Sequence, residues 1–497
     1  MKRSAGAAAA GAVGALAFPE PSWWWLAPLF LVPIFVACRT AGTAREAALH
    51  GWVAGTAFFI ATHHWSIPSV SVFVVPLGLF LGALWAPVGA VVWATLRPPL
   101  TGRRLATAGV VVPCAWVAVE LVRSWDKLGG PWALLGASQW NNRPMLTLAS
   151  LGGVWLVSLV IVGVAVAVTV LVGPRANDGQ PPRLLATAIG VALVAASLSY
   201  ASLGPTPAAE ATVRVGGVQP GVIDDPDARF AAGEAATWTL TDDEVDLVVW
   251  AESSIGFDPE DRPEFLNRVA DLAVATSAVV LVNVDRRPGP GGVYKTSLLV
   301  GADGDIGRYD KTRLVPFGEY IPLRRLLGWI TALTTAADVD RQRGDRLVLL
   351  TAPTDRGPDG RVRLGPLICF ESAFPDLTRN HVAAGADLIV LQTATTTVEG
   401  TWAQAQHASL AAVRAVETGR PVVHAALSGV SAAFDAEGRR LAWFEGDGAY
   451  LVEVPLVAPG VTPYIRFGNW VPYGSVVVLF VAAAAATVRR QRAARHA

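Results

Sequence analysis

Long apolar runs fill the first 200 positions of the chain and recur near its end. A helix that crosses a bilayer needs about 20 mostly apolar residues. The pattern predicts eight such spans, at residues 5–19, 22–37, 49–66, 69–96, 105–123, 146–172, 183–203 and 471–487. The first two are short and separated only by Pro19-Glu20-Pro21, so a re-entrant pair is the alternative to two spans.

Between residues 205 and 470, short apolar runs alternate with stretches of helical pattern. Strands are predicted at Val213–Val218, Val245–Trp250, Ala278–Val284, Thr296–Val300, Arg363–Phe370, Asp387–Thr393, Pro421–Ala426 and Ala449–Val454. Helices are predicted at 260–276, 375–385 and 401–418, and hairpin turns at 302–305 and 435–438. Strands that alternate with helices are typical of a layered α/β domain.

These patterns divide the chain into three parts. Residues 1–204 form a membrane domain with about seven transmembrane helices, 205–470 a catalytic domain, and 471–497 a last transmembrane helix with a basic tail. Lys and Arg cluster in alternate connections, beginning with Lys2 and Arg3, which favours a cytoplasmic N-terminus. Seven spans from that start put the 205–470 domain on the extracytoplasmic side of a multi-pass protein of the inner, cytoplasmic membrane.

Composition narrows the class of protein further. The chain is 52% hydrophobic but only 16% charged, which excludes a disordered chain and argues against a single soluble domain. Lys+Arg and Asp+Glu balance at 40 each, so no overall field favours nucleic acid as a partner. The three cysteines form no CxxC or Cys/His cluster, so no metal and no other cofactor is predicted.

Two candidate chemical groups follow predicted strands. Cys369 ends an apolar run shortly before a helix that starts near Asp376, and a nucleophile on such a turn is held rigidly yet exposed. For a cysteine alone, a small buried core residue is the more common interpretation. Glu252 follows the run 245–250, where a buried carboxylate could act as a base; a solvated strand-end carboxylate is the alternative.

Lys311 is the third candidate, because a positioned ammonium can stabilise an oxyanion. A surface lysine paired with Asp310 is the alternative. Lysine is scarce in this Arg-rich chain, which holds only four: Lys2, Lys127, Lys295 and Lys311. His407 and His424 fall on helix and strand positions that favour structural roles, so a Cys-His enzyme is the weaker hypothesis.

The order Glu252, Lys311, Cys369 resembles the Glu-Lys-Cys triad of the carbon-nitrogen hydrolase (nitrilase) superfamily. Within that superfamily, the membrane plan and several motifs resemble the apolipoprotein N-acyltransferase family. These motifs are Tyr309-Asp310-Lys311 with Leu314–Tyr320, Ile368–Glu371, and Gly130-Pro131-Trp132 with Ser138-Gln139. The resemblance implies a multispanning α-helical membrane domain joined to a nitrilase-like four-layer αββα sandwich.

The resemblance also implies an activity: transfer of an acyl chain from a membrane phospholipid to the α-amine of the lipidated N-terminal cysteine of apolipoproteins. Cys369 would carry the acyl chain as a thioester, with Glu252 as the base. Lys311 and a backbone N–H near Phe370 would stabilise the oxyanion, Glu319 would be a second glutamate near the site, and Glu371 would order the nucleophile turn. The implied partners are a phospholipid acyl donor, a diacylglyceryl-modified apolipoprotein acceptor and the membrane.

Three residues are candidate substrate contacts. Leu326 and Trp329 belong to the apolar stretch 322–337, which could enter the lipid interface or pack on the core of the protein. Trp402 lies beyond the segment 393–400, which departs from the Asn-Asp-x-Trp-Phe pattern of the family. The segment 427–429 departs as well, since it reads Leu-Ser-Gly where the family has Asn-Asn-Gly.

Two other classes of function are compatible with the sequence. A membrane-tethered amidase or nitrilase would form the same thioester and resolve it with water, although a hydrolase of soluble amides needs no such membrane platform. The second class is a transporter or lipid-binding scaffold with a decayed enzyme domain. The intact triad and the small number of charged residues within the spans count against it.

Overall fold

The structure is a computed structural model that describes residues 2–128, 130–173, 180–289, 292–332, 339–458 and 460–495. The chain separates into two compact units. The first comprises 1–67, 72–204 and 467–497, and the second comprises 68–71 and 205–466.

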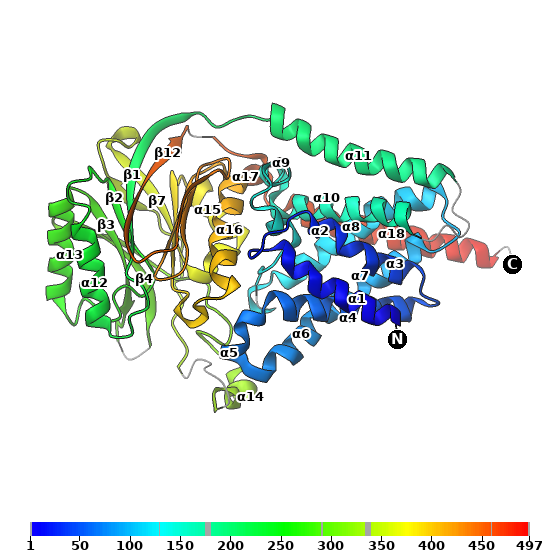
Figure 1. Cartoon of the computed structure of the whole chain (residues 1–497), viewed down its shortest axis with the longest axis horizontal. Coiled ribbons are helices and arrows are strands. Elements are labelled where there is room, and N and C mark those ends of the chain that lie inside the picture. The colour runs from blue at the N-terminus through cyan, green and yellow to red at the C-terminus, as the bar shows by residue number, and fades with distance from the viewer. Residues whose placement is uncertain are drawn as a thin grey trace. The chain divides into compact units, whose positions relative to one another are not determined.

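The first unit is helical (Figure 1). Its main helices are α1 (Lys2–Val13), α2 (Leu26–Leu29), α3 (Leu31–Arg39), α4 (Ala44–Thr62), α6 (Val74–Ala83), α7 (Ala86–Leu96), α8 (Gly102–Arg123), α9 (Arg143–Leu146), α10 (Ala149–Val172), α11 (Gln180–Leu203) and α18 (Trp470–Arg495). The short α5 spans Ile67–Val70, of which residue 67 is assigned to the first unit and 68–70 to the second.

Several helical segments of the first unit are suited to a bilayer. Five described segments are long and apolar enough to cross one: His64–Leu96, Gly102–Arg123, Ala149–Val172, Pro182–Leu203 and Trp470–Arg495. They coincide with the last five predicted spans. The three earlier predicted spans are also helical, but their helices are shorter or less apolar, so the total of eight spans stays a prediction.

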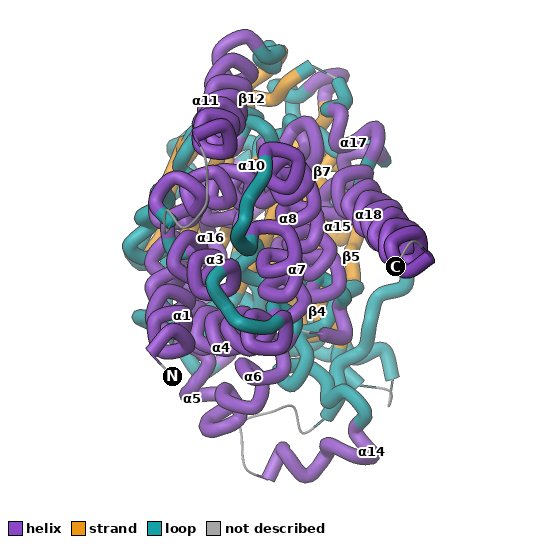
Figure 2. The backbone as a smooth tube through the Cα atoms, turned by 90° about the vertical axis from the view of Figure 1, so that its right-hand side faces the viewer, coloured by secondary structure: helices purple, strands orange, loops and turns teal. Residues whose placement is uncertain are grey.

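Helix α8 packs against α7, α10 and α18 within this unit (Figure 2). Near its end, Glu120 and Arg123 are buried and hold the loop that contains Trp132. Glu120 Oε1 accepts a hydrogen bond from the Leu135 backbone N–H at 2.7 Å, and Arg123 donates to the carbonyl oxygens of Trp132 and Ala133. The Gly130-Pro131-Trp132 motif is therefore fixed by two buried charges of α8.

The second unit contains two six-stranded sheets. The first sheet has the order β12-β1-β2-β3-β4-β5, and the second has the order β11-β10-β9-β8-β7-β6. The strands are β1 (Ala209–Gln219), β2 (Leu247–Trp250), β3 (Val279–Arg286), β4 (Tyr294–Gly301), β5 (Gly304–Asp310), β6 (Leu350–Pro353), β7 (Arg361–Ile368), β8 (Leu388–Thr393), β9 (Val422–Ala426), β10 (Ser431–Phe434), β11 (Arg440–Phe444) and β12 (Gly448–Val457). Strands β1, β2 and β3 run parallel, as do β7, β8 and β9.

Helices cover the outer face of each sheet (Figure 1). α12 (Pro226–Trp238) and α13 (Pro263–Thr276) pack on the first sheet, and α15 (Pro375–Ala383) and α16 (Trp402–Thr418) on the second. The short helices α14 (Arg324–Leu327) and α17 (Pro463–Phe467) complete the unit. This arrangement confirms the predicted four-layer αββα sandwich.

Two apolar cores hold the sandwich together. Between the sheets, residues such as Leu247 and Leu281 cluster with Leu364 and Val390. A second core fills the space between the first sheet and its helices, around Trp250. Burial of these side chains removes apolar surface from water, which is the main favourable term in folding.

The predicted strands and helices of this unit are observed with shifted ends. The predicted run Arg363–Phe370 ends earlier, because Cys369 has φ +51° and begins a 3₁₀ turn at 369–373. Both predicted hairpins are confirmed: residues 302–303 join β4 to β5, and residues 435–439 join β10 to β11. Sequence patterns missed β5, β6, β10, β11 and α12; β5 reads GDIGRYD, which lacks a clear apolar alternation.

Candidate active site

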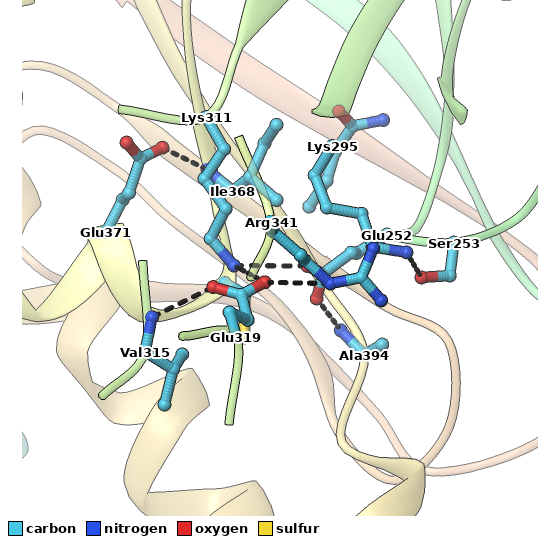
Figure 3. A network of polar contacts seen from close by, with 12 residues as sticks. Glu252, Ser253, Lys295, Lys311, Val315, Glu319, Arg341, Ile368, Glu371 and Ala394 are labelled. Carbon is cyan, nitrogen blue, oxygen red and sulfur yellow. Dashed lines mark hydrogen bonds and ion pairs between the residues drawn. The ribbon is translucent and has the colours of Figure 1, made fainter. Parts of the chain in front are cut away.

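The three predicted triad residues follow strands of the two facing sheets. Glu252 comes just after β2, Lys311 just after β5, and Cys369 just after β7. Parallel strands end at the same edge of a sheet, so residues that follow them gather there. The sandwich brings all three side chains into one cluster, in which Lys311 interacts with both Glu252 and Cys369. Figure 3 shows Lys311 and Glu252.

Lys311 lies at the centre of this cluster, with its side chain fully buried. Its Nζ donates to Glu252 Oε1 at 3.3 Å and to Glu319 Oε1 at 2.9 Å. Burial alone lowers the pKa of the ammonium, but the carboxylates of Glu252 and Glu319 outweigh it and raise that pKa above its usual value. Lys311 is therefore a fixed cation rather than a proton donor, and the alternative interpretation of a surface lysine paired with Asp310 is wrong.

Backbone groups orient both carboxylates. Glu252 Oε2 accepts from the Ala394 N–H at 3.0 Å, and Glu319 Oε2 accepts from the Val315 N–H at 2.9 Å (Figure 3). In each glutamate, one carboxylate oxygen thus accepts a hydrogen bond from a backbone N–H, and the other accepts one from Lys311. Neither side chain is the solvated strand-end carboxylate that was the alternative interpretation of Glu252.

Cys369 is partly buried and sits in the left-handed region of backbone space. Few residues with a Cβ adopt this conformation, and those that do are enriched at functional sites. Burial raises the pKa of its thiol, and Glu252 and Glu319 raise it further, while Lys311 lowers it; the net pKa is above the ordinary value. The resting group is therefore a thiol, and Glu252 is among the charged groups that act on it.

Glu371 locks the nucleophile turn to the segment that carries Lys311. Its side chain is fully buried and accepts from the Ile368 N–H at 2.9 Å and from the Tyr309 hydroxyl at 2.8 Å. The backbone N–H groups of Thr312 and Arg313 donate to the same carboxylate at 2.7 and 3.0 Å. Its contacts are those expected of a residue that orders the turn.

His407 was interpreted as structural from the sequence, and the structure adds a contact to the nucleophile. From α16, its Nε2 lies 3.0 Å from the Cys369 carbonyl oxygen and 2.7 Å from Ser372 Oγ. Burial lowers the pKa of His407 to about 4, so the ring is neutral at physiological pH. Because a carbonyl oxygen only accepts, Nε2 carries the hydrogen in this contact.

The remaining predicted residues are Phe370, Leu326, Trp329 and Trp402. Phe370 packs edge-on against Phe374, with ring centroids 5.1 Å apart. Leu326 on α14 is 70% exposed, and Trp329 in the 3₁₀ turn that follows it is 56% exposed. Residues 333–337 of the predicted apolar stretch lie outside the described residues. Trp402 begins α16 and is partly buried.

The two segments that depart from the family pattern contact each other. Glu399 Oε2 accepts from Ser428 Oγ at 2.5 Å and from Gln404 Nε2 at 2.7 Å. Thr395 Oγ1 also donates to the Ser428 carbonyl oxygen at 3.0 Å. Their altered residues therefore form one mutually bonded unit, which reaches the cluster through Ala394.

Residues 212–452, which form most of the second unit, match the carbon-nitrogen hydrolase family. Residues 10–167 match the family described as the apolipoprotein N-acyltransferase N-terminal domain. An apolipoprotein N-acyltransferase of Geobacter metallireducens is 30% identical and covers 97% of this chain and 94% of its own length. One from Azotobacter vinelandii is 31% identical over 98% and 96%.

The chain belongs to the apolipoprotein N-acyltransferase family. This finding confirms the family that the sequence motifs predicted. A solved amidase from Nesterenkonia sp. is 18% identical, covers 50% of this chain and 93% of its own, and superposes with a TM-score of 0.36.

Proposed function

We propose that this chain transfers an acyl chain from a membrane phospholipid to the α-amine of a diacylglyceryl-modified N-terminal cysteine on apolipoproteins. The observation that carries the proposal is the buried Glu252–Lys311–Cys369 cluster in a chain whose family relatives bear the name apolipoprotein N-acyltransferase. The apolar helices of the first unit support a membrane location. Such a location suits the proposed reaction, because both substrates carry lipid chains.

In the first step, Glu252 accepts the thiol proton of Cys369 as the sulfur attacks the ester carbonyl carbon of the phospholipid. The oxygen gains negative charge, which Lys311 and a backbone N–H near Phe370 stabilise. The carbon–oxygen bond then breaks, and the lysophospholipid leaves with the proton held by Glu252. The acyl chain remains on Cys369 as a thioester.

In the second step, the α-amine of the apolipoprotein attacks the thioester carbonyl. Glu252 takes a proton from the nitrogen, the carbon–sulfur bond breaks, and the sulfur recovers the proton as an amide forms. The two substrates occupy the site in turn, which gives ping-pong kinetics. Throughout both steps Lys311 stays charged, because Glu252 and Glu319 flank it.

The raised pKa of the Cys369 thiol suits this sequence of events. The proton stays on sulfur until a carbonyl carbon is in place, so a reactive thiolate does not accumulate in the resting enzyme. The same cluster is electrostatically ready for an oxyanion, because its cation is preformed and needs little reorganisation.

Membrane orientation follows from the loop charges. The catalytic unit lies on the extracytoplasmic side of the inner, cytoplasmic membrane in this proposal, supported by the Lys and Arg residues of alternate connections. Leu326 and Trp329 then serve as contacts with the lipid interface, and Trp402 as a contact on the acceptor side.

The test is transfer by the purified protein in detergent, with labelled phospholipid and a diacylated lipopeptide. Mass spectrometry of the peptide should detect one added acyl chain on its α-amine, dependent on Cys369. Release of the label as free fatty acid, with no acylated peptide, would instead support a membrane-tethered amidase or hydrolase.

A further inference from the structure

A second lysine lies beside the triad. Lys295 is on β4, directly opposite Asp285 of β3 in the antiparallel register, and its side chain is only 6% exposed. Its Nζ donates to Asp285 Oδ1 and to Ser253 Oγ, each at 2.5 Å (Figure 3 shows the serine contact). One of the few lysines of an Arg-rich chain is thus buried next to the residue that follows Glu252.

Ser253 is the residue through which this lysine reaches Glu252. Its φ of +57° lies in the left-handed region, which side chains with a Cβ rarely adopt. Two neighbouring strands hold it there: Lys295 binds its hydroxyl, and Asn283 Oδ1 accepts from its backbone N–H at 3.0 Å. The direction in which the turn presents Glu252 therefore depends on contacts from β3 and β4.

Arg341 closes the contacts into a ring. Its Nη1 is 3.9 Å from Asp285 Oδ2, its Nε is 3.9 Å from Glu319 Oε1, and its backbone N–H donates to the Glu319 carbonyl oxygen at 2.8 Å. Figure 3 shows Arg341 alongside Glu319. In order, the ring runs through Glu252, Lys311, Glu319, Arg341, Asp285, Lys295 and Ser253, whose peptide bond returns to Glu252.

Charge alternates around this ring, with three carboxylates and three cations. Other titratable or charged groups act on its members: Cys369 and His407 on Lys311, and Arg229 on Asp285. A buried ion pair that loses one partner leaves an uncompensated charge, which is strongly unfavourable. The loss of one cation would therefore disturb the remaining members as well.

We propose that Lys295 is a positioning residue for the acyl transfer reaction, which holds the turn that carries Glu252 and balances the charge of the ring. The inference rests on the proposed function, because it assigns Lys295 a role in the reaction of Cys369. A lysine suits this position, since its compact ammonium fits between a hydroxyl and a carboxylate, whereas a planar guanidinium requires a wider, forked site.

The experiment compares the Lys295→Met protein with the wild type, in detergent, with labelled phospholipid as the sole substrate. The rate of acyl-enzyme formation on Cys369 should fall about 10- to 100-fold, because a small displacement of a reacting group has effects of that size. The KM for phospholipid should change little. The acid limb of the pH–rate profile should move to higher pH, because a carboxylate with fewer cations nearby is protonated more readily.

Two further variants separate positioning from folding. Ser253→Ala removes only the hydroxyl and should lower the acylation rate by a smaller factor than Lys295→Met does. The double variant of Lys295→Met with Ser253→Ala should lower the rate by less than the product of the two single factors, because the two side chains contact each other. Arg363→Met is the matched control: it removes a cation that pairs with Asp387 at the opposite end of β7 from Cys369. The control should keep the acylation rate and the pH profile of the wild type.

The inference is overturned if Lys295→Met acylates at the wild-type rate, or if Arg363→Met shows an equal loss and pH shift. A wild-type protein that forms no acyl adduct would instead refute the proposed function. In that case, iodoacetamide alkylation of Cys369, which needs no acyl donor, still tests the ring. Alkylation of the Lys295→Met protein at pH 7 should be slower than that of the wild type and the Arg363→Met control, and equal rates would refute the role of Lys295.

Discussion

The backbone N–H of Lys311 donates to the carbonyl oxygen of Lys295 at 2.9 Å. Because of this bond, the two buried lysines of the catalytic unit are joined through the main chain as well as through the ring of charges. Lys311 contacts Glu252 directly, and Lys295 contacts the residue that follows it. Lys311 thus holds Glu252 at its side-chain carboxylate, and Lys295 holds the residue that follows Glu252 in the chain.

Cys369 is expected to carry the acyl chain. With phospholipid alone, intact-protein mass spectrometry of the wild type should show an adduct of one acyl chain, and peptide mapping should locate it on Cys369. Cys369→Ala should form no adduct and transfer nothing, because the other cysteines, Cys38 and Cys114, are buried in the first unit. An adduct that persists in Cys369→Ala, with wild-type turnover, would contradict the two-step scheme.

Lys311→Arg should lose about 100-fold or more in the rate of transfer, although it keeps the charge. Removal of one oxyanion donor has effects of this size, and a planar guanidinium cannot replace a compact ammonium between two carboxylates. The loss should appear in kcat rather than in KM for phospholipid. Arg363→Lys, the reverse exchange at a cation outside the cluster, serves as the control and should be close to wild type.

Glu371→Gln should lower the stability of the catalytic unit. The carboxylate accepts several hydrogen bonds from groups that include Tyr309 and Ile368, and each hydrogen bond to a charged group contributes roughly 1.5–3 kcal/mol. We therefore expect a lower temperature of unfolding, measured by circular dichroism in detergent. Glu244→Gln, on a carboxylate that is 75% exposed, should leave the transition almost unchanged. Equal transitions for both variants would show that Glu371 does not secure the turn.

Buried histidines should make the fold sensitive to mild acid. Burial lowers the pKa of His381 and of His407 to about 4 each, and lowers that of His424 well below its ordinary value. The folded state favours the neutral form of these histidines. Their contribution to the free energy of unfolding is therefore fully present above pH ~6.5 and declines as the pH falls toward 4. The temperature of unfolding should drop between pH 7 and pH 5, and His381→Gln should weaken that dependence. A pH-independent transition would contradict this expectation.

Leu326 and Trp329 should affect access to lipid rather than chemistry. The double variant Leu326→Ser with Trp329→Ala should raise KM for phospholipid in vesicles several-fold, since it removes apolar surface that can enter the interface. Its kcat should stay close to that of the wild type. Ile306→Ser, which removes an exposed apolar side chain of β5, is the matched control. A fall in kcat without a change in KM would show that the segment does not act at the membrane surface.

Much of this protein could be predicted from local patterns. Apolar runs of bilayer length, short strands before Glu252 and Cys369, and the turns at 302–305 and 435–438, which contain Asp and Gly, depend on neighbours in the chain. They are therefore visible in the sequence. The triad was predicted from its position after strands together with a family resemblance. Edge strands such as β5 and β11 were missed, because partly exposed strands carry polar residues that weaken the apolar alternation.

The sequence by itself determined which residues could perform the chemistry: a single cysteine in the catalytic unit, a carboxylate after a buried strand, and a lysine retained among arginines. Only the tertiary structure decided what surrounds them. Glu319, Arg341, Asp285 and Lys295 come from separate segments. Their ring of contacts exists because β2, β3, β4 and β5 lie side by side in the first sheet and the segment after β5 returns to it. Contacts between distant segments follow from packing and burial, and no local pattern of apolar and polar positions records them.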